Sequence, residues 1–264
     1  MAESDSPLHV VLIGDVVGHP GLQAAEEGLA KLRKQLPVDL VIANGENASG
    51  GFGLQEKTYH ALRDLGVDVI TLGNHAWDKK EIFLFIDSAD RIVRPANYPP
   101  NTPGRGFTIV QSGGVKVGIL QLMGRAFINI GDCPFQVADR ELKKLKSLAQ
   151  IILVEVHAEA SSEKMALAYY LDGQVSAVLG THTHVQTADE QIFPRGSGYI
   201  TDVGMTGPRD SILGIRPDLA IKRIREQLPV RFEVGVGDGM FSAVWLAIDK
   251  HTGRTLQIQR VCFR

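Results

Sequence analysis

The sequence predicts an α/β protein in which two β-sheets form one domain. Strand and helix patterns alternate between residues 9 and 86, which indicates parallel strands joined by right-handed crossovers. Two apolar strand patterns then flank Ser112-Gly113-Gly114, which is typical of an antiparallel hairpin. No repeat, low-complexity tract or linker divides the chain. Residues 9–264 are therefore expected to form a single domain after a polar leader at residues 1–8.

The N-terminal part is expected to alternate buried strands with helices. Three apolar runs predict strands that are buried on both faces, at residues 9–13, 39–43 and 67–72. Amphipathic patterns predict helices at residues 22–36, 55–65 and 79–86. Pro37 ends the first helix, because a proline disfavours helical backbone in the residue before it. The proline-rich stretch 95–106 is expected to be a long loop.

The remainder of the chain predicts the second sheet and its helices. The hairpin strands are expected at residues 107–111 and 115–120, and further buried strands at 151–156 and 177–180. Helical patterns cover residues 137–149, 161–170 and 218–228. Short strand patterns follow at residues 192–193, 199–200, 241–248 and 256–262.

Composition narrows the classes of partner and compartment. The formal net charge of −2 gives no overall attraction to nucleic acid or membranes. The sequence also lacks the long run of basic residues interleaved with aromatic ones that is typical of proteins that bind long nucleic acids. No apolar run approaches the ~18 residues of a membrane span. Two distant cysteines and a polar, acidic N-terminus favour a reducing, cytoplasmic location. An anionic substrate must then be attracted locally, by metal ions or a few basic groups.

Polar residues that can bind metal ions follow five of the predicted strands. Ligands bind outside the carboxyl ends of strands in open parallel α/β sheets. A single histidine at a strand end is more often an ordinary polar residue, but His182 and His184 lie two apart, and on an extended backbone both point to the same side. Nitrogen and oxygen ligands without a thiolate suit manganese, iron or zinc. The candidates are Asp15, Glu46, Asn47, Asn74, His157, His182 and His184.

Seven ligand candidates exceed the needs of one ion. Two ions about 3.5–4 Å apart, bridged by a carboxylate, are the usual arrangement for such a set. Such a pair acidifies a water molecule and neutralises the charge of a phosphoryl group in transfer. The sequence therefore predicts a dinuclear centre that supplies the positive charge missing from the overall balance.

The same segments resemble the ordered signature blocks of calcineurin-like metallophosphoesterases, and more closely those of the bacterial YmdB-like branch. The resemblance extends from residue 9 to the C-terminus. The first block of the wider superfamily is Asp-x-His, whereas Val17 stands at the histidine position here and Glu46 stands where the bridging aspartate is usual. Both departures resemble the YmdB-like branch. The blocks are Gly14-Asp15, 44–47, 73–75, Val156-His157 and 180–184.

The resemblance implies a four-layer α/β/β/α sandwich with two mixed sheets, iron or manganese as cofactor, and phosphodiesterase activity towards 2′,3′-cyclic nucleotides. Glu46 would bridge the two ions, and Asn47 would take the coordination place that the missing histidine leaves. One ion would be held by Asp15, Glu46, Asn47 and His184, and the other by Glu46, Asn74, His157 and His182.

His75 is the expected general acid, which protonates the leaving oxygen. It follows the proposed ligand Asn74, and alternation on an extended segment would turn its side chain away from that of Asn74. The alternative is a hydrogen-bonded histidine that only supports a ligand.

Two further residues are candidates for substrate binding. Phe52 could stack on a nucleobase, or it could only shield the loop from solvent. Arg209 could pair with a phosphate, or it could be an ordinary surface arginine.

Three functions stay open from the sequence. The first is a two-metal phosphodiesterase acting on small cyclic nucleotides. The second is a phosphomonoesterase or protein phosphatase of the same chemistry. The third is a regulatory protein whose metal site is structural, against which the intact ligand set and the separate His75 argue. The oligomeric state is also open, a homo-oligomer included.

Overall fold

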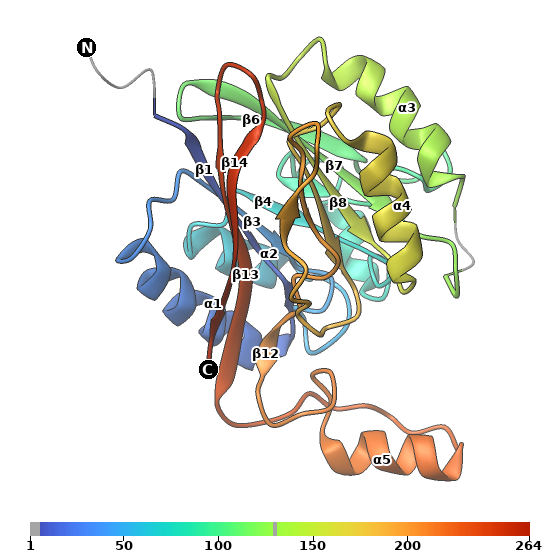
Figure 1. Ribbon diagram of the computed structural model, residues 1–264. Coiled ribbons are helices and arrows are strands. Elements are labelled where there is room, and N and C mark those ends of the chain that lie inside the picture. Colours follow the sequence, from blue (N-terminus) through green and yellow to red (C-terminus); the bar gives the residue numbers. More distant parts are fainter. Residues whose placement is uncertain (1–5, 129–130) are drawn as a thin grey trace.

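The computed structural model describes residues 6–128 and 131–264. Two β-sheets pack face to face, and helices cover the outer face of each sheet (Figure 1). The expected four-layer α/β/β/α sandwich is confirmed. No helix in the described part of the chain is long and apolar enough to cross a membrane.

The first sheet has eight strands within the described residues. Strands β1, β3 and β4 run parallel, as the alternation of strands and helices predicts. Strand β5 continues this parallel set, and β13 lies antiparallel to β1. The short strands β2, β5 and β12 were not expected from the sequence, because two to four residues carry too little pattern. The order is β2 (Asp15–Val16), β12 (Met205–Pro208), β13 (Gly239–Ile248), β1 (Leu8–Ile13), β3 (Leu40–Asn44), β4 (Val69–Thr71) and β5 (Ile92–Val93), with β14 (Thr255–Phe263) paired to β13.

The second sheet contains the predicted hairpin. Strands β6 and β7 are antiparallel, and Ser112 pairs with Val115 across a two-residue turn. Gly113 and Gly114 have φ values of 53° and 84°, a left-handed pair that glycine adopts without a steric penalty. The order is β10 (Gln191–Ile192), β11 (Gly198–Ile200), β9 (Ala177–Thr181), β8 (Ile151–His157), β7 (Val115–Met123) and β6 (Phe107–Ser112).

Helices α1 (Gly18–Arg33) and α2 (Glu56–Asp64) cover the first sheet, whereas α3 (Pro134–Leu145) and α4 (Ser161–Leu171) cover the second. The helix expected at residues 79–86 is instead a short 3₁₀ helix, η1 (Lys80–Leu84). Helix α1 begins four residues before the expected start, because the first helical turn tolerates Pro20. Helix α5 (Pro217–Glu226) lies apart from the sandwich in Figure 1, and only Ala220 of this helix is buried.

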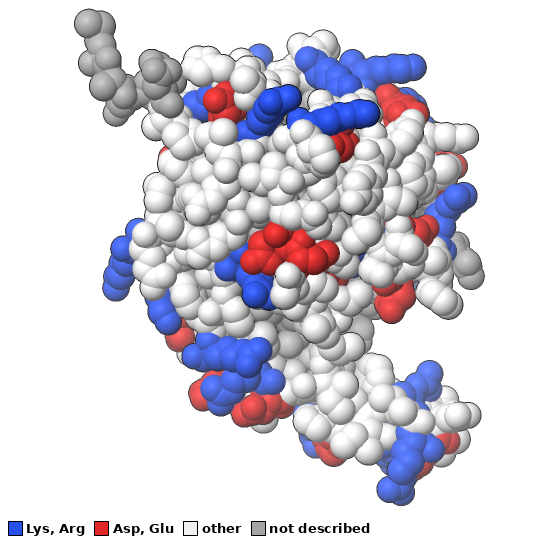
Figure 2. Space-filling model, viewed as in Figure 1, with Lys and Arg blue, Asp and Glu red and all other residues white. Residues whose placement is uncertain are grey.

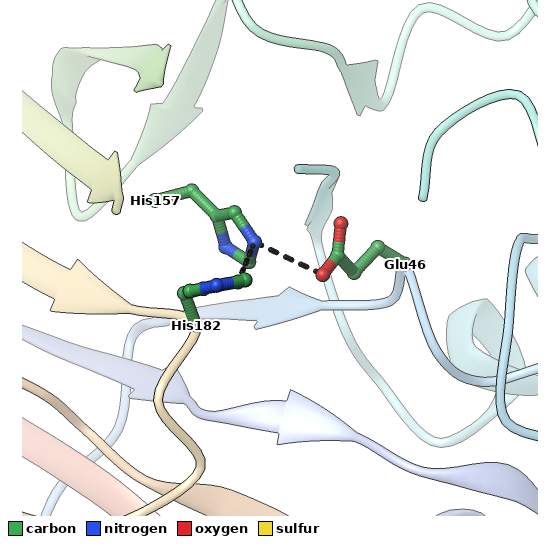
Figure 3. Close-up of side chains that lie close together, drawn as sticks. All are labelled: Glu46, His157 and His182. Atoms are coloured by element: carbon green, nitrogen blue, oxygen red, sulfur yellow. Dashed lines mark hydrogen bonds and ion pairs between the residues drawn. The ribbon is translucent and has the colours of Figure 1, made fainter. Parts of the chain in front are cut away.

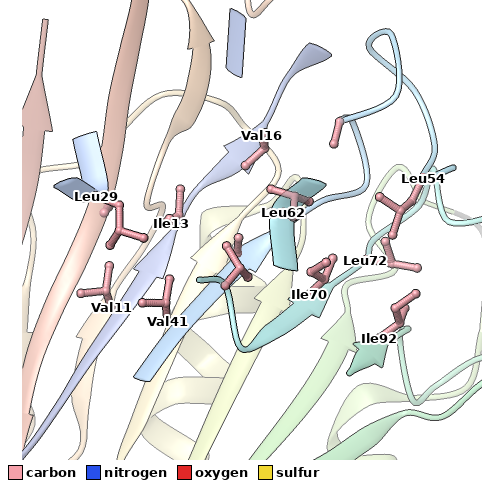
Figure 4. Packing of buried hydrophobic residues seen from close by; sticks show 14 of the residues in the cluster. Val11, Ile13, Val16, Leu29, Val41, Leu54, Leu62, Ile70, Leu72 and Ile92 are labelled. Atoms are coloured by element: carbon pink, nitrogen blue, oxygen red, sulfur yellow. The ribbon is translucent and has the colours of Figure 1, made fainter. Parts of the chain in front are cut away.

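Three apolar clusters separate the four layers. Along β1 the side chains alternate: Val11 and Ile13 pack towards the helices, whereas Val10 and Leu12 pack between the two sheets. Figure 4 shows the first of these clusters, in which Leu29 and Leu62 from the helices meet the strands. Because both faces of the central strands are buried, their sequences are continuously apolar, and polar side chains occur where the strands end.

Candidate metal centre and substrate pocket

Side chains that follow five strands meet at one edge of the sandwich. Asp15 lies in β2, which pairs with β12, and Glu46 and Asn74 lie just after β3 and β4. His157 ends β8, and the turn after β9 carries His182 and His184. Asp15, Glu46 and His157 are buried. The structure therefore brings together all seven residues that the sequence analysis singled out as metal ligands.

Three candidate ligand atoms converge around the Nε2 atom of His157. This atom lies 3.0 Å from Glu46 Oε1, 2.9 Å from Asn74 Oδ1 and 3.0 Å from His182 Nδ1. Figure 3 shows Glu46, His157 and His182 pointing towards one another, and each offers a ligand atom within 4.8 Å of the others. These residues and Asn74 are the set proposed for one of the two ions.

The other proposed set lies beside Glu46. His184 Nε2 is 3.8 Å from Asp15 Oδ1 and 3.3 Å from Asn47 Nδ2. Asn47 Nδ2 is also 3.4 Å from Glu46 Oε1. The amide nitrogen of Asn47 therefore faces Glu46 and His184. For Asn47 to bind an ion through its oxygen, the amide must rotate by 180°, and the hydrogen-bond network decides between these two orientations.

Two of the histidines are held by hydrogen bonds on their outer ring nitrogens. His184 Nδ1 donates to the carbonyl oxygen of Leu213 over 2.9 Å. His182 Nε2 lies 3.1 Å from the carboxylate of Glu159. Because both partners only accept hydrogen bonds, the inner nitrogen of each ring is left with a lone pair towards the centre. This pattern is typical of histidines that bind metal ions.

The orientation of His157 is determined by Thr181 and Glu155. The paired register of β8 and β9 places His157 beside Thr181, and His157 Nδ1 is 3.0 Å from the Thr181 hydroxyl. That hydroxyl donates its single hydrogen to Glu155 Oε1 over 2.9 Å, so it accepts from the N–H of His157. In the neutral ring, which a bound cation would require, the lone pair of His157 Nε2 then faces the centre.

Glu155 is buried beneath the centre and accepts several hydrogen bonds. The donors besides Thr181 are the Asn44 amide at 2.8 Å, the Thr71 hydroxyl at 2.6 Å and the Gln121 amide at 3.3 Å. Burial raises the pKa of Glu155, and the hydrogen bonds from Thr71 and Asn44 oppose that rise. The sequence analysis missed this residue. The available signal was an acidic residue inside a buried apolar strand, two positions before His157 and so on the same face.

The residues present fit a cation. Asp15 is fully buried, yet its Oδ1 atom has no hydrogen-bond partner among the described residues, and such an orphaned oxygen is costly. The two inner nitrogens of His157 and His182 lie 3.0 Å apart, a distance at which their two lone pairs repel each other unless a cation or a proton lies between them. Nitrogen and oxygen donors of this kind suit iron, manganese and zinc.

The charges of the centre also favour a cation. Burial opposes protonation of His157, but the carboxylate of Glu46 and its hydrogen bond raise the pKa of His157 to about 9. Burial likewise opposes ionisation of Glu46, but His157 lowers the pKa of Glu46 to about 2. Burial and then the charge of His157 lower the pKa of His182 to about 3. Without a bound cation, a proton on His157 therefore supplies the positive charge that balances Glu46.

The turn that carries His182 and His184 is strained and is held by a buried ion pair. The two histidines have φ values of 104° and 63°, in the left-handed region that residues with a side chain seldom adopt. The expectation of an extended segment here is wrong, although both rings reach the centre. Asp202 accepts the backbone N–H of Thr183 over 3.0 Å, and the buried Lys164 of α4 donates to the same carboxylate over 2.7 Å.

His75 lies beside the ligand atoms and faces a pocket. Its Nδ1 is 2.8 Å from Asp78 Oδ2, and its side chain is 30% exposed. The expected extended backbone is wrong here too, because residues 73–78 form turns. Those turns bring Asp78 under the ring, a contact that the sequence analysis missed. The pocket has a volume of about 750 Å³ and is lined by Asn74, His75, Asp78, Phe127, Ile128, Glu159 and His182.

Phe52 and Arg209 lie outside the lining of this pocket. The ring of Phe52 packs edge-to-face on His75, with ring centroids 5.0 Å apart. Arg209 pairs with Asp210 and Asp238 at 3.5 Å and 3.3 Å, and it lines a separate hollow together with His184. Phe52 thus supports His75, and Arg209 already has two acidic partners.

Glu155→Gln is expected to weaken metal binding by about 10- to 100-fold, the usual effect of removing a partner that orients a ligand. Glutamine presents an N–H to donors that need an acceptor, so the Thr181 hydroxyl turns and the lone pair of His157 is no longer directed at the centre. Calorimetric titration of the metal-free protein with Mn²⁺ measures this, with thermal unfolding as the check of folding. Glu141→Gln, which changes a buried acid of α3 that pairs with Lys144, is the control. Equal Mn²⁺ affinity in both variants would contradict the assignment.

Comparisons with known proteins agree with the resemblance seen in the sequence. Residues 11–261 match the family model described as YmdB-like protein. The chain is 49% identical over 254 residues to the 2′,3′-cyclic-nucleotide 2′-phosphodiesterase of Bacillus subtilis (strain 168), covering 96% of each chain.

Two solved structures share the fold over nearly the whole chain. A hypothetical protein from Thermus thermophilus has a TM-score of 0.91 and 47% identity, with 97% of this chain and 99% of that chain covered. A novel phosphatase from Mycoplasma pneumoniae has a TM-score of 0.92 and 32% identity, with 98% and 94% covered. The predicted resemblance is confirmed, and the chain belongs to the YmdB-like family.

Proposed function

We propose that this chain is a metal-dependent phosphoric ester hydrolase that cleaves 2′,3′-cyclic nucleotides. The relative from Bacillus subtilis carries that activity in its name. One observation in this structure carries the proposal: an imidazole fixed by a carboxylate, His75 with Asp78, lies beside the cation-binding cluster without being part of it and faces the same pocket. Such a group can give a proton to a leaving oxygen.

Two cations fit the two sets of ligands. Glu46, Asn74, His157 and His182 would hold one, and Asp15, Asn47 and His184 would hold the other, with Glu46 shared. Iron or manganese is the expected metal and zinc an acceptable one, given the nitrogen and oxygen donors. When bound, the two cations supply positive charge for the phosphate and acidify an attacking water molecule.

The protein's own residues would protonate the leaving oxygen. In hydrolysis at the 2′ position, water attacks phosphorus, the bond from phosphorus to O2′ breaks, and O2′ needs a proton because an alkoxide is a poor leaving group. Asp78 accepts a hydrogen bond from Nδ1 of His75, so in the imidazolium form of His75 the second, transferable proton lies on Nε2. Phe52 packs against the ring and limits its rotation. His75 thereby delivers the proton from a fixed position.

Surface charge supports a small substrate rather than a long polyanion. On the face drawn in Figure 2, the described Lys and Arg side chains lie in separate groups among acidic ones rather than in a continuous band. A long nucleic acid needs an extended basic track.

Cys133 and Cys262 are free thiols, which accords with a reducing, cytoplasmic environment.

A phosphomonoesterase of the same chemistry is the second candidate, favoured by the description of the Mycoplasma pneumoniae structure as a phosphatase.

Purified protein loaded with Mn²⁺ or Fe²⁺ should be assayed against 2′,3′-cyclic AMP, 3′,5′-cyclic AMP and 3′-AMP. We expect metal-dependent conversion of 2′,3′-cyclic AMP to 3′-AMP, which then accumulates. Release of inorganic phosphate from 3′-AMP at a higher rate would favour the phosphomonoesterase, and inactivity on all three would contradict both.

A further inference from the structure

Phe127 is held in an unfavourable state at the rim of the pocket. Its side chain is 89% exposed, although phenylalanine is normally buried. Its φ of 63° lies in the left-handed region, which is uncommon for any residue other than glycine. Strain of this kind at a pocket is a reason to look for a function, because folding alone gives no cause to keep it.

The fold pins the backbone on both sides of Phe127. Before it, the carboxylate of Glu163 on α4 accepts the backbone N–H of Arg125 at 3.0 Å and of Ala126 at 3.0 Å. After it, Ile128 is buried in a small cluster with Tyr98 and Met123. Because the residues on both sides of Phe127 are held in place, its ring stays exposed to solvent and does not pack into the core.

The ring shares the pocket with the groups proposed for the chemistry. Asn74 and His182 line it from the ligand cluster, and His75 lines it as the proposed proton donor. Phe127 and Ile128 supply the apolar part of the lining, whereas Asp78 and Glu159 supply carboxylates. Those carboxylates repel a phosphate but accept hydrogen bonds from hydroxyl and amino groups. The lining thus suits a molecule whose phosphate lies at the cation cluster and whose other end is flat and apolar with polar edges.

We propose that Phe127 is the platform on which the nucleobase of the substrate stacks, so that the enzyme selects cyclic nucleotides over cyclic phosphates without a base. This inference rests on the proposed function. Every base has a π-face, and stacking on an aromatic ring is tolerant of base identity. The pocket therefore accepts both purine and pyrimidine nucleotides. Phe52, which the sequence suggested for stacking, packs on His75 instead.

The test compares two substrates with the same five-membered cyclic phosphate, 2′,3′-cyclic AMP and glycerol 1,2-cyclic phosphate. Phe127→Ala is expected to raise KM for 2′,3′-cyclic AMP by about 5- to 100-fold, the effect of losing one stacked base. Its KM for glycerol 1,2-cyclic phosphate and its kcat for both substrates should stay within about twofold of the wild type. Phe127→Trp should keep a low KM for 2′,3′-cyclic AMP, because the flat ring is retained. Ile224→Ala, at another exposed apolar residue on α5, is the control and should change neither substrate.

Two outcomes would overturn the platform. Equal changes in KM for the two substrates would mean that Phe127 shapes the loop rather than binds a base. A change in the oligomeric state of Phe127→Ala on gel filtration, with both KM values unchanged, would mean that a second copy covers the ring.

A separate readout keeps this inference distinct from the proposed function. Stacking of a base quenches indole fluorescence, so 2′,3′-cyclic AMP should quench Phe127→Trp relative to the wild type, and glycerol 1,2-cyclic phosphate should not. If the wild type hydrolyses neither diester, the proposed function is wrong, and quenching still supports the platform. If the wild type is active but 2′,3′-cyclic AMP does not quench Phe127→Trp, the platform is wrong and the proposed function stands.

Discussion

Glu46→Gln is expected to lose both its bound metal and its turnover while the protein stays folded. Both carboxylate oxygens are in use: Oε1 lies 3.0 Å from His157 Nε2, and Oε2 accepts the backbone N–H of His75 at 3.0 Å. An amide is neutral and replaces one of these oxygens with a donor. Because Glu46 would bridge the two proposed ions, we expect a fall in kcat of at least about 10³-fold. Elemental analysis, steady-state kinetics and thermal unfolding measure the three quantities.

The matched control is again Glu141→Gln, which should keep wild-type metal content and turnover. The wild type should contain close to two transition-metal ions per chain after reconstitution with manganese or iron. A reproducible content of one ion would contradict a dinuclear centre. Wild-type turnover in Glu46→Gln would contradict the bridging role.

His75→Ala is expected to reduce turnover of 2′,3′-cyclic AMP by about 10²–10⁴-fold with no change in metal content. The backbone N–H that contacts Glu46 is unaffected by this substitution, so the ligand cluster keeps that hydrogen bond. The loss should shrink for bis(p-nitrophenyl) phosphate, because nitrophenolate leaves without a proton. Rates on the two substrates and elemental analysis measure the effect.

Asp78→Asn is the companion variant for His75→Ala. It keeps the imidazole but removes the charged acceptor from Nδ1, so its effect on 2′,3′-cyclic AMP should be smaller and again weaker on the aryl ester. An equal loss on both leaving groups in His75→Ala would indicate a role in binding or geometry. Loss of metal from His75→Ala would make His75 a ligand, and the division of roles at this site would be wrong.

The local sequence determined which residues could take part in the centre. Buried parallel strands are apolar on both faces, so their polar residues gather at the ends, and the carboxyl ends of neighbouring strands share an edge. Asp15, Glu46, Asn74 and His157 were predicted on that ground, and they meet in the structure. The hairpin at Gly113-Gly114 was predicted because its turn depends only on adjacent residues.

Only the tertiary structure decided how those residues are directed. The turns at residues 73–78 and 182–184 replace extended backbone that the strand patterns implied, because strand pairing stops before them. The contact of Glu155 with Thr181 and the ion pair of Lys164 with Asp202 join segments that are distant in the sequence. The different positions of Phe52 and Phe127 have the same origin. Local pattern shows that a loop aromatic exists, but the packing of neighbouring segments sets whether its ring lies against a histidine or faces the pocket.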